Sequence, residues 1–295
     1  MSNYTDFIIQ ETVKLLNIDS PTGYTDDAAE FVLTELRALG YAPTKTRKGG
    51  VLVNLGGADA ENGVMLETHL DTLGGMVAEI KSNGRLRLTN IGGMNANNAE
   101  AENVRVVTKF DGKYEGTLQL TDASIHVNGD YSTTARAWEK MEVVLDENVS
   151  SKDEVRALGI EVGDFISLDP RAVHTPSGYI KSRHLDDKAS ASVLLALAKM
   201  AASSDLTLSR KIYLVFTVHE EVGHGCCAGL PEDVEDILSV DMGCVGDDLT
   251  CDETMVSICA KDSRGPYNYE MTGRLIELAK DNNLKYAVDV YPMYA

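Results

Sequence analysis

A histidine and an aspartate two positions apart close an apolar run, and this pair constrains the fold more than any other feature. The apolar run is 64–66, and residues 64–68 (VMLET) are predicted to form a strand that runs into His69. In an extended segment, positions i and i+2 lie on the same face, so Asp71 can orient the His69 imidazole. The pattern predicts a functional position at the end of a strand, although His69 could instead be an ordinary polar residue there.

Acidic residues recur at the edges of three later predicted elements. Glu220 and Glu221 follow the apolar run 211–218, Asp241 follows the run 236–240, and Asp186 precedes an apolar segment that starts near residue 188. In an open α/β sheet, ligands gather at the carboxyl ends of the strands. One imidazole and several carboxylates at such an edge are the ligand set of a hydrolase with two metal ions.

Each acidic pair also has an ordinary interpretation. Adjacent side chains at a strand end point in different directions, so one of Glu220 and Glu221 could bind a metal while the other accepts a proton from water. Alternatively, both could be solvated in a loop. Asp186 would suit a bridge between two metals, but Asp186 and Asp187 could simply be the acidic first turn of a helix. Asp241 alone supports either interpretation equally.

Two histidines flank the glutamate pair without forming the helical zincin motif. That motif places its histidines at i and i+4, whereas His219 and His224 are five positions apart with Gly223 between them. On a helix, a spacing of five directs the two imidazoles apart. We therefore interpret both as neighbours of the site rather than ligands. Cys226 and Cys227 are interpreted as small buried thiols, with soft metal ligands as the alternative.

The order of apolar patterns predicts an α/β fold, with a mixed sheet flanked by helices. Helices are expected over 4–17, 26–39 (with Thr25 as N-cap), 188–202 and 270–281, and strands over 51–55, 64–68, 211–218, 236–240 and 285–291. The run 211–218 is typical of a strand buried on both faces. Between these elements, short alternating segments such as 85–88 and 117–120 predict a small β-rich insert. We expect a catalytic α/β domain over 1–74 and 179–295, with the inserted β-rich domain over 75–178.

Composition and charge exclude several classes of partner. The chain has 295 residues and a formal net charge of −19, so nucleic acid and anionic membrane surfaces are poor partners. Neither a charged-then-apolar leader nor an apolar stretch of about 18 residues is found. The five cysteines are an odd number without the spacing of a disulfide scaffold. We expect a soluble cytoplasmic protein with reduced thiols.

Taken together, these segments resemble the M42 family of metal-dependent aminopeptidases. The matching segments are Ser20-Pro21-Thr22-Gly23, His69-Leu70-Asp71, Leu185-Asp186-Asp187-Lys188-Ala189, Glu220-Glu221-Val222-Gly223 and Val240-Asp241. Their order matches, as does the β-rich insert between the first two metal-binding segments. The resemblance spans nearly the whole chain and implies a zinc-exopeptidase-like fold.

The resemblance also implies roles for individual residues. His69 and Asp241 would bind one metal, Glu221 the other, Asp186 would bridge them, Glu220 would be the general base, and Asp71 would support His69. The implied reaction is hydrolysis of N-terminal residues from peptides by metal-activated water. The implied cofactors are two divalent metal ions, zinc or cobalt. The implied assembly is a homo-oligomer, from a dimer up to a dodecamer.

One expected ligand has no counterpart in this sequence. The family carries a final histidine ligand near its C-terminus, and no histidine follows His224 here. The expectation is a truncated product or a natural short form that holds its second metal weakly or through a replacement. The alternatives to an aminopeptidase are a related deacylase or dipeptidase and a non-catalytic assembly subunit. The N-terminal residue preference is left open, although Arg183, Lys188, Lys261 and Arg264 lie near candidate loops.

Overall fold

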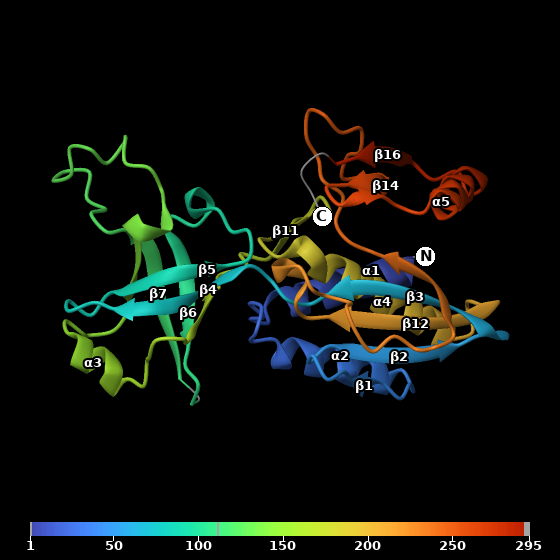
Figure 1. Ribbon diagram of the computed structural model, residues 1–295, viewed down its shortest axis with the longest axis horizontal. Helices are drawn as coiled ribbons and strands as arrows, with labels where there is room; N and C mark the ends of the chain where they lie inside the picture. The colour runs from blue at the N-terminus through green and yellow to red at the C-terminus, as the bar shows by residue number, and fades with distance from the viewer. Residues whose placement is uncertain (1, 111, 292–295) are drawn as a thin grey trace. The chain divides into compact units, whose positions relative to one another are not determined.

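A mixed five-stranded sheet carries the segment that ends at His69. The computed structural model describes residues 2–110 and 112–291 (Figure 1). The strand order is β1-β2-β12-β3-β13, with β3, β12 and β13 parallel and β2 antiparallel to β12. The bounds are β1 Thr44–Lys45, β2 Val51–Gly56, β3 Asp59–His69, β12 Arg210–Thr217 and β13 Val234–Ser239.

The register of the parallel strands brings their carboxyl ends to one edge of the sheet. Thr217 at the end of β12 pairs with His69 at the end of β3, and Ser239 at the end of β13 pairs with Glu67. The residues that follow β3 and β12 therefore leave the sheet next to each other. This is the edge at which the sequence predicts the functional residues.

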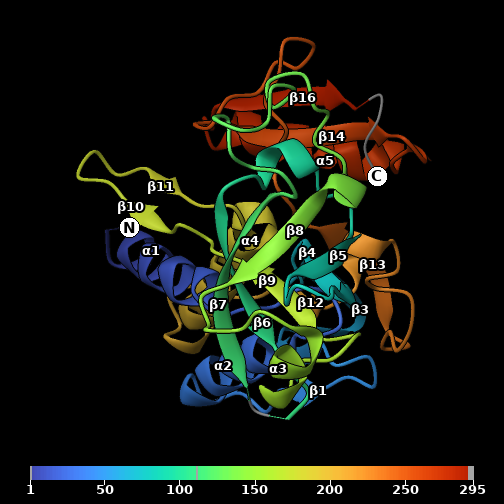
Figure 2. The same cartoon turned by 90° about the vertical axis from the view of Figure 1, so that its left-hand side faces the viewer.

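Three helices pack on this sheet and form its core. They are α1 Ser2–Leu16, α2 Asp26–Ala38 and α4 Leu185–Ala202, and Figure 2 shows them gathered on the same side of the sheet. Leu15, Val32, Leu195 and Phe216 are among the buried residues of this cluster. Thr25 is the N-cap residue of α2, but its side chain makes no capping hydrogen bond. The helix therefore begins where the sequence predicts, without the predicted cap interaction.

Phe216 is the largest apolar side chain that is fully buried in this core. We expect Phe216→Ala to lower the free energy of unfolding by about 3–5 kcal/mol, because it removes apolar contacts and leaves a cavity. Urea titration would measure the loss. Val193→Ala on α4 is the control, since Val193 is 44% exposed and its truncation creates no cavity. Equal losses in the two variants would contradict the expectation.

The prediction that residues 211–218 are buried on both faces is correct for only half of β12. Leu214 to Thr217 are buried, whereas the first four residues of β12 are half-buried. The reason lies in two ion pairs, Arg210 with Asp236 and Lys211 with Asp233. Charged side chains at the start of the strand keep contact with water, so the apolar environment begins only at Leu214.

A closed six-stranded barrel forms the other part of the first unit. Its strand order is β4-β5-β8-β7-β6-β9. The bounds are β4 Gly74–Ile80, β5 Leu86–Ile91, β6 Glu102–Val107, β7 Lys113–Leu120, β8 Met141–Leu145 and β9 Phe165–Leu168, and the helix α3 spans Lys152–Ala157. Leu118 and Leu120 are buried while Thr117 and Gln119 are half-buried, as the predicted alternation requires.

The chain divides into two compact units, Met1–Val240 and Asp241–Ala295. The second unit has a three-stranded sheet of order β15-β14-β16 and the helix α5. Its bounds are β14 Val256–Asp262, β15 Gly265–Pro266, α5 Tyr269–Asp281 and β16 Tyr286–Val290. In the first unit, β10 Val173–His174 and β11 Ile180–Lys181 form a separate two-stranded sheet, and short 3-10 helices span Ala96–Asn98, Trp138–Lys140 and Glu220–Val222. Among the described residues, no helix is long and apolar enough to cross a membrane.

Candidate metal centre

The His69 ring is buried at the end of β3, with its two nitrogens in different surroundings. Nδ1 lies 2.9 Å from the carbonyl oxygen of Asp71 and 3.5 Å from the Oδ1 of that residue. Nε2 lies 3.0 Å from Oδ1 of Asp186 and 3.7 Å from Oε2 of Glu220. His69 and Asp71, two positions apart in the sequence, are thus in direct contact, as their spacing predicts.

These distances make the Nε2 side of His69 suited to a cation. Nδ1 faces carbonyl and carboxylate oxygens, which are acceptors, so Nδ1 carries a proton. Nε2 then faces carboxylate oxygens of Asp186 and Glu220. A neutral imidazole nitrogen and a carboxylate are both electron-pair donors, so this pairing requires either a second proton or a metal ion between them. Imidazole nitrogen and carboxylate oxygen are ordinary zinc ligands, and the donor set fits a divalent metal.

Asp71 is fully buried and holds the loop that carries the two glutamates. Its carboxylate accepts hydrogen bonds from the Thr22 hydroxyl at 2.7 Å, the Glu220 backbone N–H at 3.1 Å and the Glu221 backbone N–H at 3.3 Å. Burial acts to raise the pKa of Asp71, but hydrogen bonds from His69, Thr22 and Glu220 outweigh it and lower that pKa. Asp71 therefore stays ionised and fixes both glutamates relative to His69.

Glu220 and Glu221 lie in the short 3-10 helix that follows β12. Gly223 ends this turn in the left-handed region, with a φ of 83°. Burial, assisted by the nearby negative charge of Asp186, raises the pKa of Glu221 to about 8, against the opposing effect of His69. The carboxylates of Glu221 and Asp186 thus lie close enough to repel each other.

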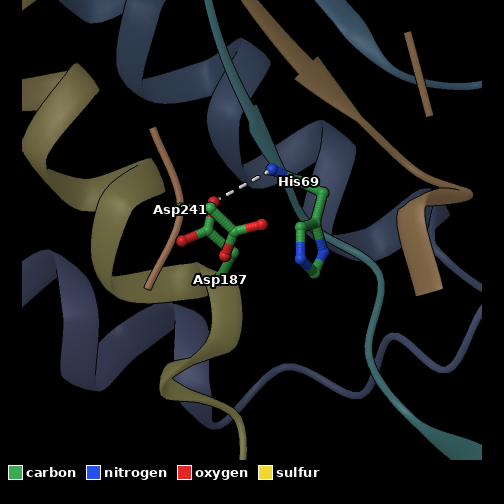
Figure 3. A group of neighbouring side chains, drawn as sticks. All are labelled: His69, Asp187 and Asp241. Atoms are coloured by element: carbon green, nitrogen blue, oxygen red, sulfur yellow. Dashed lines mark hydrogen bonds between the residues drawn. The ribbon is translucent and has the colours of Figure 1, made fainter. Parts of the chain in front are cut away.

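Asp187 is a residue of the site whose position the sequence analysis did not assign. It is fully buried, and its Oδ2 accepts hydrogen bonds from the Thr68 hydroxyl and, at 3.3 Å, from the His69 backbone N–H. Figure 3 shows this carboxylate directed at the His69 backbone. The peptide bond between Asp186 and Asp187 is cis. The available sequence signal was only the adjacency of two aspartates before an apolar helix.

Asp241 is the first residue of the second unit and is separated from the end of β13 by Val240 alone. The preceding backbone N–H, that of Val240, donates to the carbonyl oxygen of Glu67 at 2.7 Å. The structure therefore brings together His69, Asp71, Asp186, Glu220 and Glu221 within the first unit. Asp241 leaves β13 at the carboxyl end of that strand, as the sequence predicts.

The two histidines beside the glutamate pair contact each other. The rings of His219 and His224 are stacked, with centroids 4.9 Å apart. Nδ1 of His224 lies 3.0 Å from Nζ of Lys48. An ammonium group against a ring nitrogen disfavours a metal ion at that atom, because the two cations would repel each other. The interpretation of Cys226 and Cys227 as small buried thiols is wrong for Cys227, which is exposed, and Cys226 is only half-buried. Partial burial raises the pKa of the Cys226 thiol to about 11.

Two of the four basic residues noted near candidate loops, Arg183 and Lys188, donate hydrogen bonds to other residues of the first unit. The Arg183 guanidinium donates to Glu102 at 2.7 Å and lines a cavity of about 300 Å³ with Arg171 and Lys181. Nζ of the fully buried Lys188 donates to the carbonyl oxygen of Ile18 at 2.6 Å, and burial lowers the pKa of Lys188 to about 7. Lys261 and Arg264 belong to the second unit.

Comparison with known proteins identifies relatives along almost the entire chain. The sequence profile of the M42 glutamyl aminopeptidase family matches residues 49–295. The Bacillus subtilis (strain 168) protein YhfE is 40% identical over 281 residues, which cover 95% of this chain and 81% of YhfE.

Solved structures show the same fold at lower sequence identity. An aminopeptidase from the archaeon Desulfurococcus kamchatkensis has a TM-score of 0.83 and 22% identity, over 98% of this chain and 81% of that one. The TET1 peptidase of Pyrococcus horikoshii has a TM-score of 0.80 and 22% identity, over 96% of this chain and 84% of that one. The predicted zinc-exopeptidase-like α/β fold is thereby confirmed.

Proposed function

The chain belongs to the M42 glutamyl aminopeptidase family, and we propose that it is a metal-dependent aminopeptidase that removes N-terminal residues from peptides. The observation that carries this proposal is the convergence on one imidazole nitrogen. Nε2 of His69 lies 3.0 Å from Asp186 and 3.7 Å from Glu220, inside a network fixed by Asp71. A hydrolytic centre needs this combination of metal ligands and a carboxylate base.

Two divalent ions, zinc or cobalt, would be held by four side chains. The proposed ligands are His69, Asp186, Glu221 and Asp241, with Asp186 shared between the two ions. When bound, the ions would supply Lewis acidity, polarising the scissile carbonyl group and making water a stronger acid. The Asp71 carbonyl oxygen keeps the Nδ1 proton of His69 in place, so that Nε2 presents its lone pair.

Glu220 is the proposed general base. Its carboxylate takes a proton from the attacking water and passes it to the leaving amine, which requires a fixed position near the site. The hydrogen bond from the Glu220 backbone N–H to Asp71 supplies that position. Glu221 is anchored on the same carboxylate. Asp71 thus sets the relative positions of His69 and both glutamates.

The proposal also covers the oligomeric state of the protein and its cellular compartment. The Pyrococcus horikoshii TET1 peptidase can assemble into a tetrahedron or a large octahedral shell. We propose that this chain also forms a homo-oligomer that acts on peptides, in the cytoplasm. None of the five cysteines, all of which lie in the described part of the chain, forms a disulfide, which suits a reducing compartment.

A panel of three substrate classes tests the proposed reaction. The full chain, supplied with zinc or cobalt, is incubated with unblocked peptides, with the same peptides N-acetylated, and with N-acyl amino acids. We expect stepwise loss of N-terminal residues from the unblocked peptides only. Mass spectrometry of the products over time would measure this loss. Hydrolysis of the N-acyl amino acids instead would assign a deacylase. No hydrolysis of any class would favour a non-catalytic subunit.

A further inference from the structure

An aspartate between the first two helices, Asp19, is hydrogen-bonded to side chains of the barrel. The Asp19 carboxylate accepts from Arg105 on β6 through Nε at 2.9 Å to Oδ2 and through Nη2 at 2.6 Å to Oδ1. The Ser167 hydroxyl on β9 adds a third donor at 2.8 Å. Arg105 and Asp19 are 20% and 8% exposed, respectively, so water screens this pair only weakly. A bidentate arginine–carboxylate pair fixes orientation as well as distance.

The residues around Asp19 are hydrogen-bonded to α4 and to the residues that follow β3. Nζ of Lys188 donates to the Ile18 carbonyl oxygen at 2.6 Å. The Ser20 hydroxyl donates to the Leu70 carbonyl oxygen at 2.7 Å, and the Ser20 carbonyl oxygen accepts from the Thr72 backbone N–H at 2.9 Å. Residues 18–22, called here the clamp segment, therefore run beside the residues that follow His69.

The clamp segment ends at the carboxylate that organises the metal centre. The Thr22 backbone N–H donates to the Thr72 carbonyl oxygen at 3.1 Å, and the Thr22 hydroxyl donates to Oδ2 of Asp71 at 2.7 Å. Asp71 in turn accepts from the backbone N–H groups of Glu220 and Glu221. Arg105 of the barrel is thus connected to the proposed general base in four steps. Arg105 binds Asp19, the chain runs from Asp19 to Thr22, Thr22 binds Asp71, and Asp71 binds the Glu220 backbone N–H.

We propose that Asp19 and Arg105 are positioning residues, through which the barrel fixes the clamp segment and so sets the placement of Glu220 and Glu221. The proposal rests on the proposed function for its catalytic consequence. Its structural consequence, the order of the glutamate loop, does not depend on activity. Because displacements of about 1 Å in a catalytic group can lower rates by about 100-fold, a pair remote from the reacting atoms can control turnover.

The barrel contains a second arginine–carboxylate pair that serves as a matched control. Arg136 donates to Glu100 through Nε at 2.7 Å and through Nη2 at 3.1 Å, and the two side chains are 15% and 21% exposed. In the described part of the chain, no hydrogen bond or ion pair links Arg136 or Glu100 to the clamp segment. Arg136→Gln therefore removes a comparable ion pair without touching the proposed series.

The test compares Arg105→Gln, Arg105→Lys, Asp19→Asn and Arg136→Gln with the unaltered protein. Amide hydrogen exchange of residues 218–223 is measured in metal-free protein, kcat and KM in metal-loaded protein, and unfolding midpoints in all. We expect exchange in 218–223 to be about 10-fold faster in Arg105→Gln and Asp19→Asn, since a charge-assisted hydrogen bond is lost. We also expect kcat to fall by about 10- to 100-fold with KM little changed. Arg105→Lys keeps the positive charge, so its exchange rate in 218–223 and its kcat should both lie between those of Arg105→Gln and those of the unaltered protein.

Arg136→Gln should lower the unfolding midpoint, but it should change neither the exchange rate of residues 218–223 nor kcat. Unchanged exchange in 218–223 for both Arg105→Gln and Asp19→Asn would overturn the proposal, as would equal effects in Arg136→Gln. If Arg105→Gln does not fold, Asp19→Asn decides, because it keeps a hydrogen-bonding side chain of the same shape. If the unaltered protein hydrolyses no peptide, the proposed function fails, while the exchange measurement still decides the positioning role.

Discussion

Glu220→Gln is expected to lower kcat on unblocked peptides by about 10²- to 10⁴-fold, because it removes the carboxylate that accepts a proton from water. The amide has the shape of the carboxylate, and the backbone N–H that binds Asp71 is retained. Metal content and unfolding midpoint should therefore stay close to those of the unaltered protein. Steady-state kinetics and metal analysis on the same preparation would measure both.

The control for this substitution is Glu232→Gln, which neutralises an exposed glutamate of the same unit. It should leave kcat unchanged, which separates loss of the base from loss of one negative charge. Full activity of Glu220→Gln would remove Glu220 from the mechanism. Loss of metal from Glu220→Gln would instead make Glu220 a ligand.

Asp71→Ala is expected to lower the free energy of unfolding by about 3 kcal/mol or more, because three donors lose the charged, fully buried acceptor that they share. These donors are the Thr22 hydroxyl and the backbone N–H groups of Glu220 and Glu221. Activity should be lost as well, since the loop loses its anchor. Denaturant titration and peptide hydrolysis would measure the two effects.

Thr22→Val provides the graded control for Asp71→Ala. It removes one of the donors to Asp71 and keeps the other two, so the expected loss is about 1 kcal/mol. A loss in Asp71→Ala no larger than in Thr22→Val would contradict the role given to Asp71. The comparison is made in metal-free protein, so that bound metal does not add to stability.

Local sequence patterns were enough to predict which residues lie at the ends of strands. His69 and Asp71 could be paired from sequence because the two-residue period of an extended chain is fixed by covalent geometry. The edge at which the strands end could be predicted because neighbouring parallel strands of a sheet share a direction. The fold class and most helix bounds could be predicted as well, because the spacing of apolar residues differs between helices and strands.

Contacts between distant segments could not be predicted from local sequence patterns. The position of Asp187 depends on how the chain enters α4, and its partners Thr68 and His69 lie 119 and 118 residues away. The pair formed by Arg105 and Asp19 joins residues 86 positions apart, across two separate hydrophobic cores. No periodicity within either segment determines which charged residues meet when two such cores dock.

Metal dependence of peptide hydrolysis tests the central claim most directly. The chain is stripped with a chelator, dialysed, and assayed on an unblocked peptide during stepwise addition of zinc or cobalt. We predict no release of N-terminal residues from the stripped protein, and recovery that reaches a plateau near two metal ions per chain. Undiminished hydrolysis after complete metal removal would contradict the account, and so would a metal-saturated protein that releases nothing.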